Sequence, residues 1–190
     1  MIPDEAAALR LHEKYGSDER IVRHCQAVTK VALLLTEALA ARNVAVDKRA
    51  IAAGALLHDI GRTRTHEVQH GYVGAELLSA EGVDEVVLEI VRKHVGAGIS
   101  KQEALTLGFP KGDYVPRTLE EKVVCFSDKM VSSDSVRPFE EEVRRFVRKG
   151  HDVNRLRKLK EDIAESLGGD PEAVIFSMMQ AAFDSTNVRT

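Results

Sequence analysis

Residues 51–61 read Ile-Ala-Ala-Gly-Ala-Leu-Leu-His-Asp-Ile-Gly, an apolar stretch that ends in the ionisable pair His58-Asp59. Its apolar residues recur at helical spacing, and Asp47 is placed to cap the helix. Two adjacent ionisable residues behind an apolar run are costly to bury unless another group compensates them. A metal cation is such a group, because imidazole and carboxylate are natural ligands of metals. The alternative is a histidine favoured by the dipole at a helix C-terminus, beside a surface aspartate.

The helical spacing of apolar residues continues along nearly the whole chain. Caps, glycines and prolines then predict helices over residues 3–16, 18–43, 47–61, 66–80, 84–94, 100–108, 119–131, 138–150, 153–167 and 171–184. No segment alternates with period two for long enough to require a sheet. We therefore predict an all-α chain, with one main domain over residues 1–135. Residues 136–190 are predicted to form a C-terminal helical extension packed on the same domain.

The composition is that of a soluble globular protein. The chain of 190 residues is long enough for one domain with a buried core. Its formal net charge of −3 gives no overall attraction to nucleic acid or to an anionic membrane. The N-terminus lacks a signal-peptide pattern and the apolar runs are too short to span a bilayer, so we expect a cytoplasmic protein. Cys25 and Cys125 form no CxxC pair, and we expect both to be buried free thiols.

Three further ionisable residues lie on apolar faces of predicted helices. His24 flanks the buried stripe of residues 18–43, and His94 continues the apolar stripe of residues 84–94. Asp128 lies beside the stripe of residues 119–131. Any one of them alone is more often a core polar group with a satisfied hydrogen bond than a ligand. Four separate helices that each direct a histidine or aspartate inward instead favour a metal site.

In this order, the residues resemble the HD superfamily of metal-dependent phosphohydrolases. The resemblance covers residues 18–135, and the tetrapeptide His-Asp-Ile-Gly over residues 58–61 is a common form of the family's core motif. It implies an HD-domain-like helical bundle in which one divalent metal is held by His24, His58, Asp59 and Asp128. Some branches hold a second metal through two more histidines, which match His70 and His94 here, with Asp59 bridging both ions. This combination is most similar to bacterial symmetrical diadenosine tetraphosphate hydrolases, and also to HD phosphodiesterases that act on cyclic dinucleotides.

Two details of the ligand set stay open in the sequence. His66 lies four residues before His70, on the same face if one helix includes both, and either histidine could be the ligand. We favour His70, because the residues that follow it fit the family better. Mixed nitrogen and oxygen ligands favour Mn, Fe, Co, Ni or Zn over Mg or Ca. The resemblance implies iron, and we expect one or two divalent transition-metal ions, with iron and manganese first.

Basic residues near the motif are candidates for binding substrate phosphate. The family usually has lysine at the position of Arg62, and arginine keeps the positive charge while adding bidentate geometry. The alternative is a solvated arginine in a polar loop. Arg64 is a weaker candidate for the same role. For Lys129, which follows Asp128, we expect a surface lysine rather than a phosphate contact.

The segment from Arg144 to Lys160 is rich in lysine and arginine, with Asp152 as its one acidic residue. The helix dipole explains basic residues near the end of the helix over 138–150 but not those of the next helix. Few aromatic residues are interleaved, which does not indicate a base-stacking surface. A nucleic-acid surface, a rim that steers polyphosphate substrates and a solvated face are all compatible with the pattern, and we favour the solvated face.

The sequence therefore predicts a phosphohydrolase that cleaves a nucleotide or dinucleotide with metal-activated water. Asp59 is expected to orient the nucleophile, and Arg62 to help hold the substrate. One alternative is a mononuclear deoxynucleoside 5′-monophosphatase, which would need only His24, His58, Asp59 and Asp128. An alternative of another class is a non-catalytic module that binds a nucleotide or RNA for regulation. We expect a nucleotide phosphate as substrate, no nucleic-acid partner and no membrane, and the oligomeric state stays open.

Overall fold

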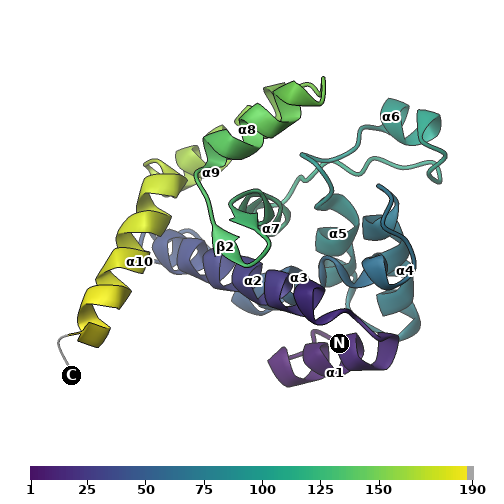
Figure 1. Cartoon of the computed structure of the whole chain (residues 1–190), viewed down its shortest axis with the longest axis horizontal. Helices are drawn as coiled ribbons and strands as arrows, with labels where there is room; N and C mark the ends of the chain where they lie inside the picture. Colours follow the sequence, from purple (N-terminus) through teal and green to yellow (C-terminus); the bar gives the residue numbers. More distant parts are fainter. Residues whose placement is uncertain (188–190) are drawn as a thin grey trace.

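The computed structural model describes the backbone of residues 1–187 and the side chains of residues 1–184. The helices follow in the order α1 (Glu5–Tyr15), α2 (Glu19–Ala40), α3 (Lys48–Leu57), the 3₁₀ helix η1 (Ile60–Thr63), α4 (His70–Ala80), α5 (Glu85–Lys93), α6 (Lys101–Thr106), α7 (Leu119–Lys129), α8 (Phe139–Arg148), α9 (Asn154–Leu167) and α10 (Pro171–Asn187) (Figure 1). A two-residue hairpin, β1 (Val131–Ser132) and β2 (Ser135–Val136), separates α7 from α8. The all-α prediction is confirmed.

Several helices begin at the capping residues that the sequence predicted. Asp47 caps α3 by accepting from the amides of Arg49 and Ala50. Ser100 and Thr118 each form a full capping box with the glutamate three residues later. Each such cap satisfies amide donors that the helix leaves unpaired, and one is worth about 1 kcal/mol. The local chemistry of the sequence therefore sets the register of the helices that carry the site.

Two predicted boundaries differ from the structure. Helix α4 begins at His70 rather than at residue 66, because residues 66–69 form turns in which the His70 ring bonds the Glu67 carbonyl. Helix α3 ends at Leu57, and η1 carries the chain on toward α4. Gly61 makes this step possible, because a Cβ there would lie 2.0 Å from the His70 carbonyl oxygen. The backbones of η1 and α4 thus approach closely beside Asp59 and His70.

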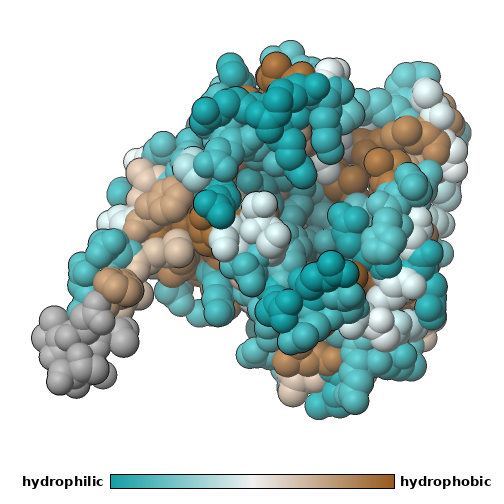
Figure 2. Space-filling model, viewed as in Figure 1, coloured by the Kyte–Doolittle hydropathy of each residue, from teal (hydrophilic) through white to brown (hydrophobic). Residues whose placement is uncertain are grey.

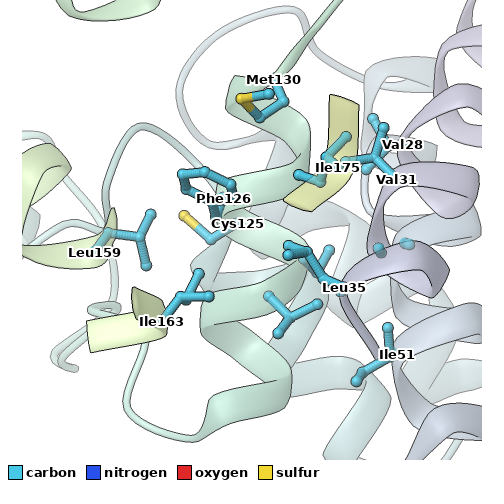
Figure 3. Packing of buried hydrophobic residues seen from close by; sticks show 14 of the residues in the cluster. Val28, Val31, Leu35, Ile51, Cys125, Phe126, Met130, Leu159, Ile163 and Ile175 are labelled. Atoms are coloured by element: carbon cyan, nitrogen blue, oxygen red, sulfur yellow. The ribbon is translucent and has the colours of Figure 1, made fainter. Parts of the chain in front are cut away.

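The largest hydrophobic cluster surrounds α2 and α7 (Figure 3). Helices α9 and α10 contribute Ile163 and Ile175 to it, so the C-terminal helices share a core with the residues before them. Phe139, at the start of α8, stacks on Phe126 with ring centroids 4.9 Å apart. Both predicted free thiols are buried. The division of the chain at residue 135 stays a prediction.

Large apolar residues are exposed at several places on the described surface, among them Met1, Val68 and Val147. Phe176, Met179 and Phe183 are exposed on α10, which projects from the body of the molecule (Figure 2). Leu105 and Leu107 are exposed at the end of α6. Within the part of the chain that the structure describes, no helix has the length and apolarity that crossing a membrane requires.

Candidate metal centre

Six of the predicted ligands come together from six different elements. Most of them stand at element ends, where the chain can turn a side chain inward without breaking a helix. They are His24 within α2, His58 after the last residue of α3, Asp59 before η1, His70 at the start of α4, His94 after the last residue of α5, and Asp128 near the end of α7. The structure thus brings together residues that are up to 104 positions apart in the chain.

One half of the cluster forms around Asp128. Its Oδ1 lies 3.1 Å from His24 Nε2 and 3.6 Å from His58 Nε2. The His58 side chain is fully buried, whereas those of His24 and Asp128 are about one-sixth exposed and reach the surface of a cavity. Ring centroids of His24 and His58 are 5.2 Å apart.

The other half of the cluster forms around Asp59. Its Oδ1 lies 3.2 Å from His70 Nε2 and 3.4 Å from His94 Nε2, and its Oδ2 lies 3.8 Å from His58 Nε2. Asp59 therefore stands between the two halves, with histidine nitrogens near both of its oxygens. Donor atoms lie within 4.8 Å of one another in three groups, which are His24, His58 and Asp59; His58, His94 and Asp128; and Asp59, His70 and His94.

All four histidines of the cluster are held in the same way by the backbone. Each Nδ1 lies 2.7 Å from a carbonyl oxygen: Ser133 for His24, Ala55 for His58, Glu67 for His70 and Val91 for His94. A carbonyl only accepts, so each Nδ1 carries the proton and donates it. When such a ring is neutral, the lone pair of its Nε2 faces the centre. This is the arrangement in which backbone hydrogen bonds orient metal-binding histidines.

Two of the converging atoms have no hydrogen-bond partner in the protein. They are His58 Nε2 and Asp59 Oδ1, and both are buried. The Nε2 atoms of His70 and His94 lie 3.0 Å apart although the Nδ1 of each ring already donates to a carbonyl. Buried lone pairs and carboxylates that face one another repel, and a divalent cation converts that repulsion into ligation. The donor set therefore fits one or two transition-metal ions.

The electrostatics of the protein alone point the same way. Burial, against weaker opposing effects of Asp59, lowers the pKa of His94 to about 4, which keeps its imidazole neutral near neutral pH. Burial would raise the pKa of Asp59, but His58, His70 and His94 hold it well below its ordinary value. Burial likewise opposes ionisation of Asp128, and Lys129, His24 and His58 overcome it. At His94, Asp59 and Asp128 the protein alone thus favours the forms that ligate metals. At the other two histidines burial opposes protonation, but Cys25 and Asp59 raise the pKa of His58 well above its ordinary value, and Asp128 raises that of His24.

The basic residues predicted near the motif have different positions. Arg62 donates from Nε to Asp59 Oδ2 at 2.7 Å, and its partly exposed side chain lines two adjoining cavities. Arg64 stacks over the Tyr15 ring, 5.6 Å from its centroid, and lines neither cavity. His66 is exposed and lines both cavities but lies outside the groups of candidate ligands, so the structure favours His70.

Lys129 corrects one expectation. The sequence indicated a surface lysine, but the Lys129 side chain is only 8% exposed and pairs with the Asp128 carboxylate. Its Nζ also donates to the His94 carbonyl at 3.3 Å. Lysine at this position therefore ties together the residues that carry two candidate ligands. The cause is the end of α7, where the chain turns into the hairpin and leaves the lysine inside.

Ser133 is a residue of the site that the sequence did not indicate. It lies in the turn between β1 and β2 with φ 57°, a conformation that non-glycine residues rarely adopt. Its carbonyl oxygen accepts from His24 Nδ1. Because the contact is made by the backbone, the identity of the side chain gives no signal of it.

Five of the six candidate ligands, all but His58, line a cavity of about 920 Å³. Residues of α8 line the same cavity. A second cavity of about 510 Å³ shares His24, Asp59, Arg62 and His66 with the first. The volume of the larger cavity is at the upper end of what small-molecule sites usually have.

A family model agrees with this geometry. The model of the HD domain matches residues 21–132, which is more than half of the chain. The chain belongs to the HD domain family. All six candidate ligands lie within the residues that match the family model.

Similar proteins carry several different names. A tRNA (cytidine(56)-2′-O)-methyltransferase of Picrophilus torridus is 40% identical over 171 residues, which cover 89% of this chain and 49% of that protein. Uncharacterized protein MJ0778 of Methanocaldococcus jannaschii is 48% identical over 113 residues, 60% of this chain and 67% of that protein. A ribonuclease Y of Acidothermus cellulolyticus is 32% identical over 88 residues, 45% of this chain and 16% of that protein. The chain thus spans about half the length of the methyltransferases it matches.

A solved structure has a similar fold. The HD domain of the L. monocytogenes phosphodiesterase PgpH, in complex with cyclic-di-AMP, superposes with a TM-score of 0.60 and 13% identity. The match covers 93% of this chain and 96% of that one. The fold of the HD domain therefore extends over nearly the whole chain, the C-terminal helices included.

Proposed function

We propose that this HD domain is a metal-dependent phosphohydrolase that cleaves a phosphate ester or anhydride of a nucleotide or dinucleotide. The observation that carries the proposal is the set of four histidines whose Nδ1 atoms are all bonded to carbonyls and whose Nε2 atoms converge on two aspartates. We assign His24, His58, Asp59 and Asp128 to one metal, and His70, His94 and Asp59 to a second. Iron or manganese is the proposed metal, with cobalt, nickel or zinc as alternatives.

When bound, such metals supply an activated water and neutralise charge on phosphoryl oxygens. The protein supplies the positions. Asp59 has one oxygen near His70 and His94 and the other bonded to Arg62, so it holds a fixed orientation at the boundary of the two half-sites. Arg62 is anchored through Nε and partly exposed to both cavities, a placement that suits binding of a substrate phosphate. The role of Arg64 as a substrate contact is a weaker part of the proposal, since its side chain lies on Tyr15.

Several relatives support a nucleotide phosphate as the substrate. The similar PgpH domain is a phosphodiesterase in complex with cyclic-di-AMP, and other relatives are named ribonuclease Y. The diadenosine tetraphosphate hydrolases remain a proposed parallel, based on the ligand residues alone. A cavity of about 920 Å³ is large enough for a dinucleotide.

Two alternatives make different demands on the same residues. A mononuclear 5′-monophosphatase would use His24, His58, Asp59 and Asp128 and leave His94 structural. A non-catalytic module would bind nucleotide or RNA without turnover, and the methyltransferase relatives favour such a role in RNA metabolism. The convergence of His70 and His94 on Asp59 favours the two-metal enzyme over both.

The test is metal content followed by turnover. We expect about two equivalents of iron or manganese per chain in protein purified anaerobically without a histidine tag, and hydrolysis of cyclic or linear dinucleotides. His94→Ala should then lose one equivalent and most of the activity, whereas His151→Ala, a histidine outside the cluster, should lose no metal. One equivalent with full activity in His94→Ala would favour the monophosphatase. Nucleotide binding without turnover, across all metals added, would refute the enzyme.

A further inference from the structure

Helix α8 forms a basic wall of the cavity that contains the metal centre. Arg144, Arg145, Arg148 and Lys149 all line the cavity, together with Arg137 just before the helix. The surface over α8 is mostly hydrophilic in the space-filling view (Figure 2), with Val147 as an exposed apolar residue of the helix. The candidate ligands His24, Asp59, His70, His94 and Asp128 line the same cavity. A substrate held at the ligands therefore lies within reach of this wall.

The two halves of the basic segment 144–160 are partnered differently. On α9, Arg157 is exposed, forms no ion pair among the described residues and does not line the cavity. The other three basic residues are paired: Arg155 with Glu103 at 2.6 Å, Lys158 with Asp162 at 2.7 Å, and Lys160 with Asp170 and Glu172. These ion pairs join the protein's own acidic residues to the helix and need no external partner.

On α8 the pattern is different. Arg144, Arg148 and Lys149 are exposed, and among the described residues none of them forms an ion pair with an acidic side chain. Arg145 is the exception, because it pairs with Glu142 at 2.6 Å. Three of the four basic residues that α8 and its C-cap place at the cavity are thus without an acidic partner among the described residues.

The helix dipole explains only part of this arrangement. It favours basic residues near the C-terminal end of α8 and acidic ones near its start, where Glu141 and Glu142 also line the cavity. The dipole sets no preference for one side of the helix, so it does not account for three unpaired basic residues that line the cavity. The C-terminal half of α8 is consequently the part of the wall that suits an anion.

We propose that this wall binds the backbone of a single-stranded oligonucleotide whose reacting phosphate lies at the metal centre. From its N-cap Pro138 to its C-cap Lys149, α8 extends about 16 Å, which is longer than one nucleotide needs. A flexible single strand can bring one phosphate down to ligands as buried as His58 and Asp59 while its neighbours stay at the rim. A rigid duplex holds its phosphates on its outer surface and cannot. This inference rests on the proposed function and extends its substrate from a nucleotide to a strand.

The wall provides basic side chains that can contact phosphates, but few aromatic side chains on which bases could stack. Phe146 is the one phenylalanine or tyrosine among the cavity-lining residues, and its ring already contacts His151 at 5.6 Å. Stacking on aromatic side chains is the usual way to hold bases of a single strand. The proposed contacts are therefore to phosphates, and we expect binding with little preference for base sequence. This proposal departs from the expectation of no nucleic-acid partner, which rests on the net charge of the whole chain and on the few aromatic residues in the basic segment.

The test compares two triple variants that remove the same charge. Arg144→Gln/Arg148→Gln/Lys149→Gln removes the wall, and Arg10→Gln/Lys30→Gln/Arg157→Gln removes three exposed charges that line neither cavity. Binding of a fluorescein-labelled phosphorothioate dodecanucleotide is measured by anisotropy at several salt concentrations, with metal bound. Hydrolysis of the corresponding phosphodiester strand is compared with that of bis(p-nitrophenyl) phosphate, a diester with one phosphate.

Each phosphate contact on a single strand contributes about −0.7 to the slope of the log binding constant against log salt concentration. Loss of three contacts should therefore make this slope less negative by about 2. The wall variant should also lose at least tenfold more kcat/KM on the strand than on the small diester. The control variant should match the wild type in both measurements. An unchanged slope in the wall variant, or an equal change in the control, would overturn the inference. The binding measurement needs no turnover. If the proposed hydrolase function is wrong, the wild-type protein will hydrolyse neither the strand nor bis(p-nitrophenyl) phosphate, whatever the binding measurement shows.

Discussion

Gly61 lies where η1 and α4 meet, and replacing it with alanine should displace one half of the metal centre. A Cβ at this position would lie 2.0 Å from the His70 carbonyl oxygen and 2.6 Å from the Gly74 amide nitrogen. Both are backbone atoms, so no change of side-chain rotamer relieves the clash. The two segments must instead move apart, and they carry Asp59 and His70.

The size of the displacement follows from ordinary contact distances. A carbon atom and a carbonyl oxygen approach to about 3.3 Å, so the start of α4 must move by roughly 1 Å. Metal–ligand distances tolerate deviations of only about 0.2 Å. The His70 ring, bonded to the backbone at Glu67, would move with the chain and leave the position near Asp59. Overpacking at a buried site also costs about 1–3 kcal/mol of unfolding free energy.

Gly169→Ala is the matched control, because a Cβ there has open space around it. Elemental mass spectrometry should show that Gly61→Ala loses about one of two metal equivalents, and urea unfolding should show the loss of stability. The control should keep its metal and its stability. If Gly61→Ala keeps both equivalents and unfolds at the wild-type urea concentration, the close approach of η1 and α4 does not position His70.

Three further outcomes follow from other parts of the structure. Phe139→Ala should cost about 3–5 kcal/mol in urea unfolding, in one transition seen by all probes; a separate early transition would show that the C-terminal helices fold independently. Arg155 lowers the pKa of Glu103 to about 2, so this pair's contribution is present above the unfolded pKa near 4 and is lost as the pH falls toward 2. Since the pair is largely exposed, Arg155→Gln should cost less than about 1 kcal/mol near pH 7, and the cost should shrink as the pH falls below 4 and through 2; an equal cost at pH 7 and pH 2 would contradict the assignment. Chelation should lower the melting temperature, by the equivalent of about 2.7 kcal/mol if free metal had been at 100 times its Kd; an unchanged melting temperature would argue against bound metal in the folded state.

The fold was accessible from the sequence because local signals and the core pattern agree. Asp47 caps α3, and the capping boxes at Ser100 and Thr118 form as predicted. The boundary at His70 was not accessible, because residues 66–69 have no breaker and their turn is fixed by contacts with distant parts of the chain. Gln69, for example, donates to the Leu107 carbonyl. Such long-range contacts have no local signature.

The candidate ligands were accessible for a related reason. An imidazole or carboxylate on an apolar helical face needs compensation, so His24, His94 and Asp128 are candidates by their position, and their combination with His58-Asp59 favours a metal site. The sequence could not show how the rings are oriented, because their partners are backbone carbonyls. It also assigned Lys129 to the surface, since the hydropathy of a lysine does not reveal that a carboxylate beside it is buried.

The hairpin between α7 and α8 connects the two parts of the site. The Ser133 carbonyl, in the turn of the hairpin, accepts from His24 Nδ1. The strands of the same hairpin lead directly into α8, whose residues line the cavity. Val131 pairs with Val136 in a register that a one-residue deletion would shift, so the orientation of His24 and the position of Arg144 and Arg148 would change together. The orientation of a metal ligand and the position of the proposed phosphate-binding wall therefore depend on one short turn, which only the folded chain reveals.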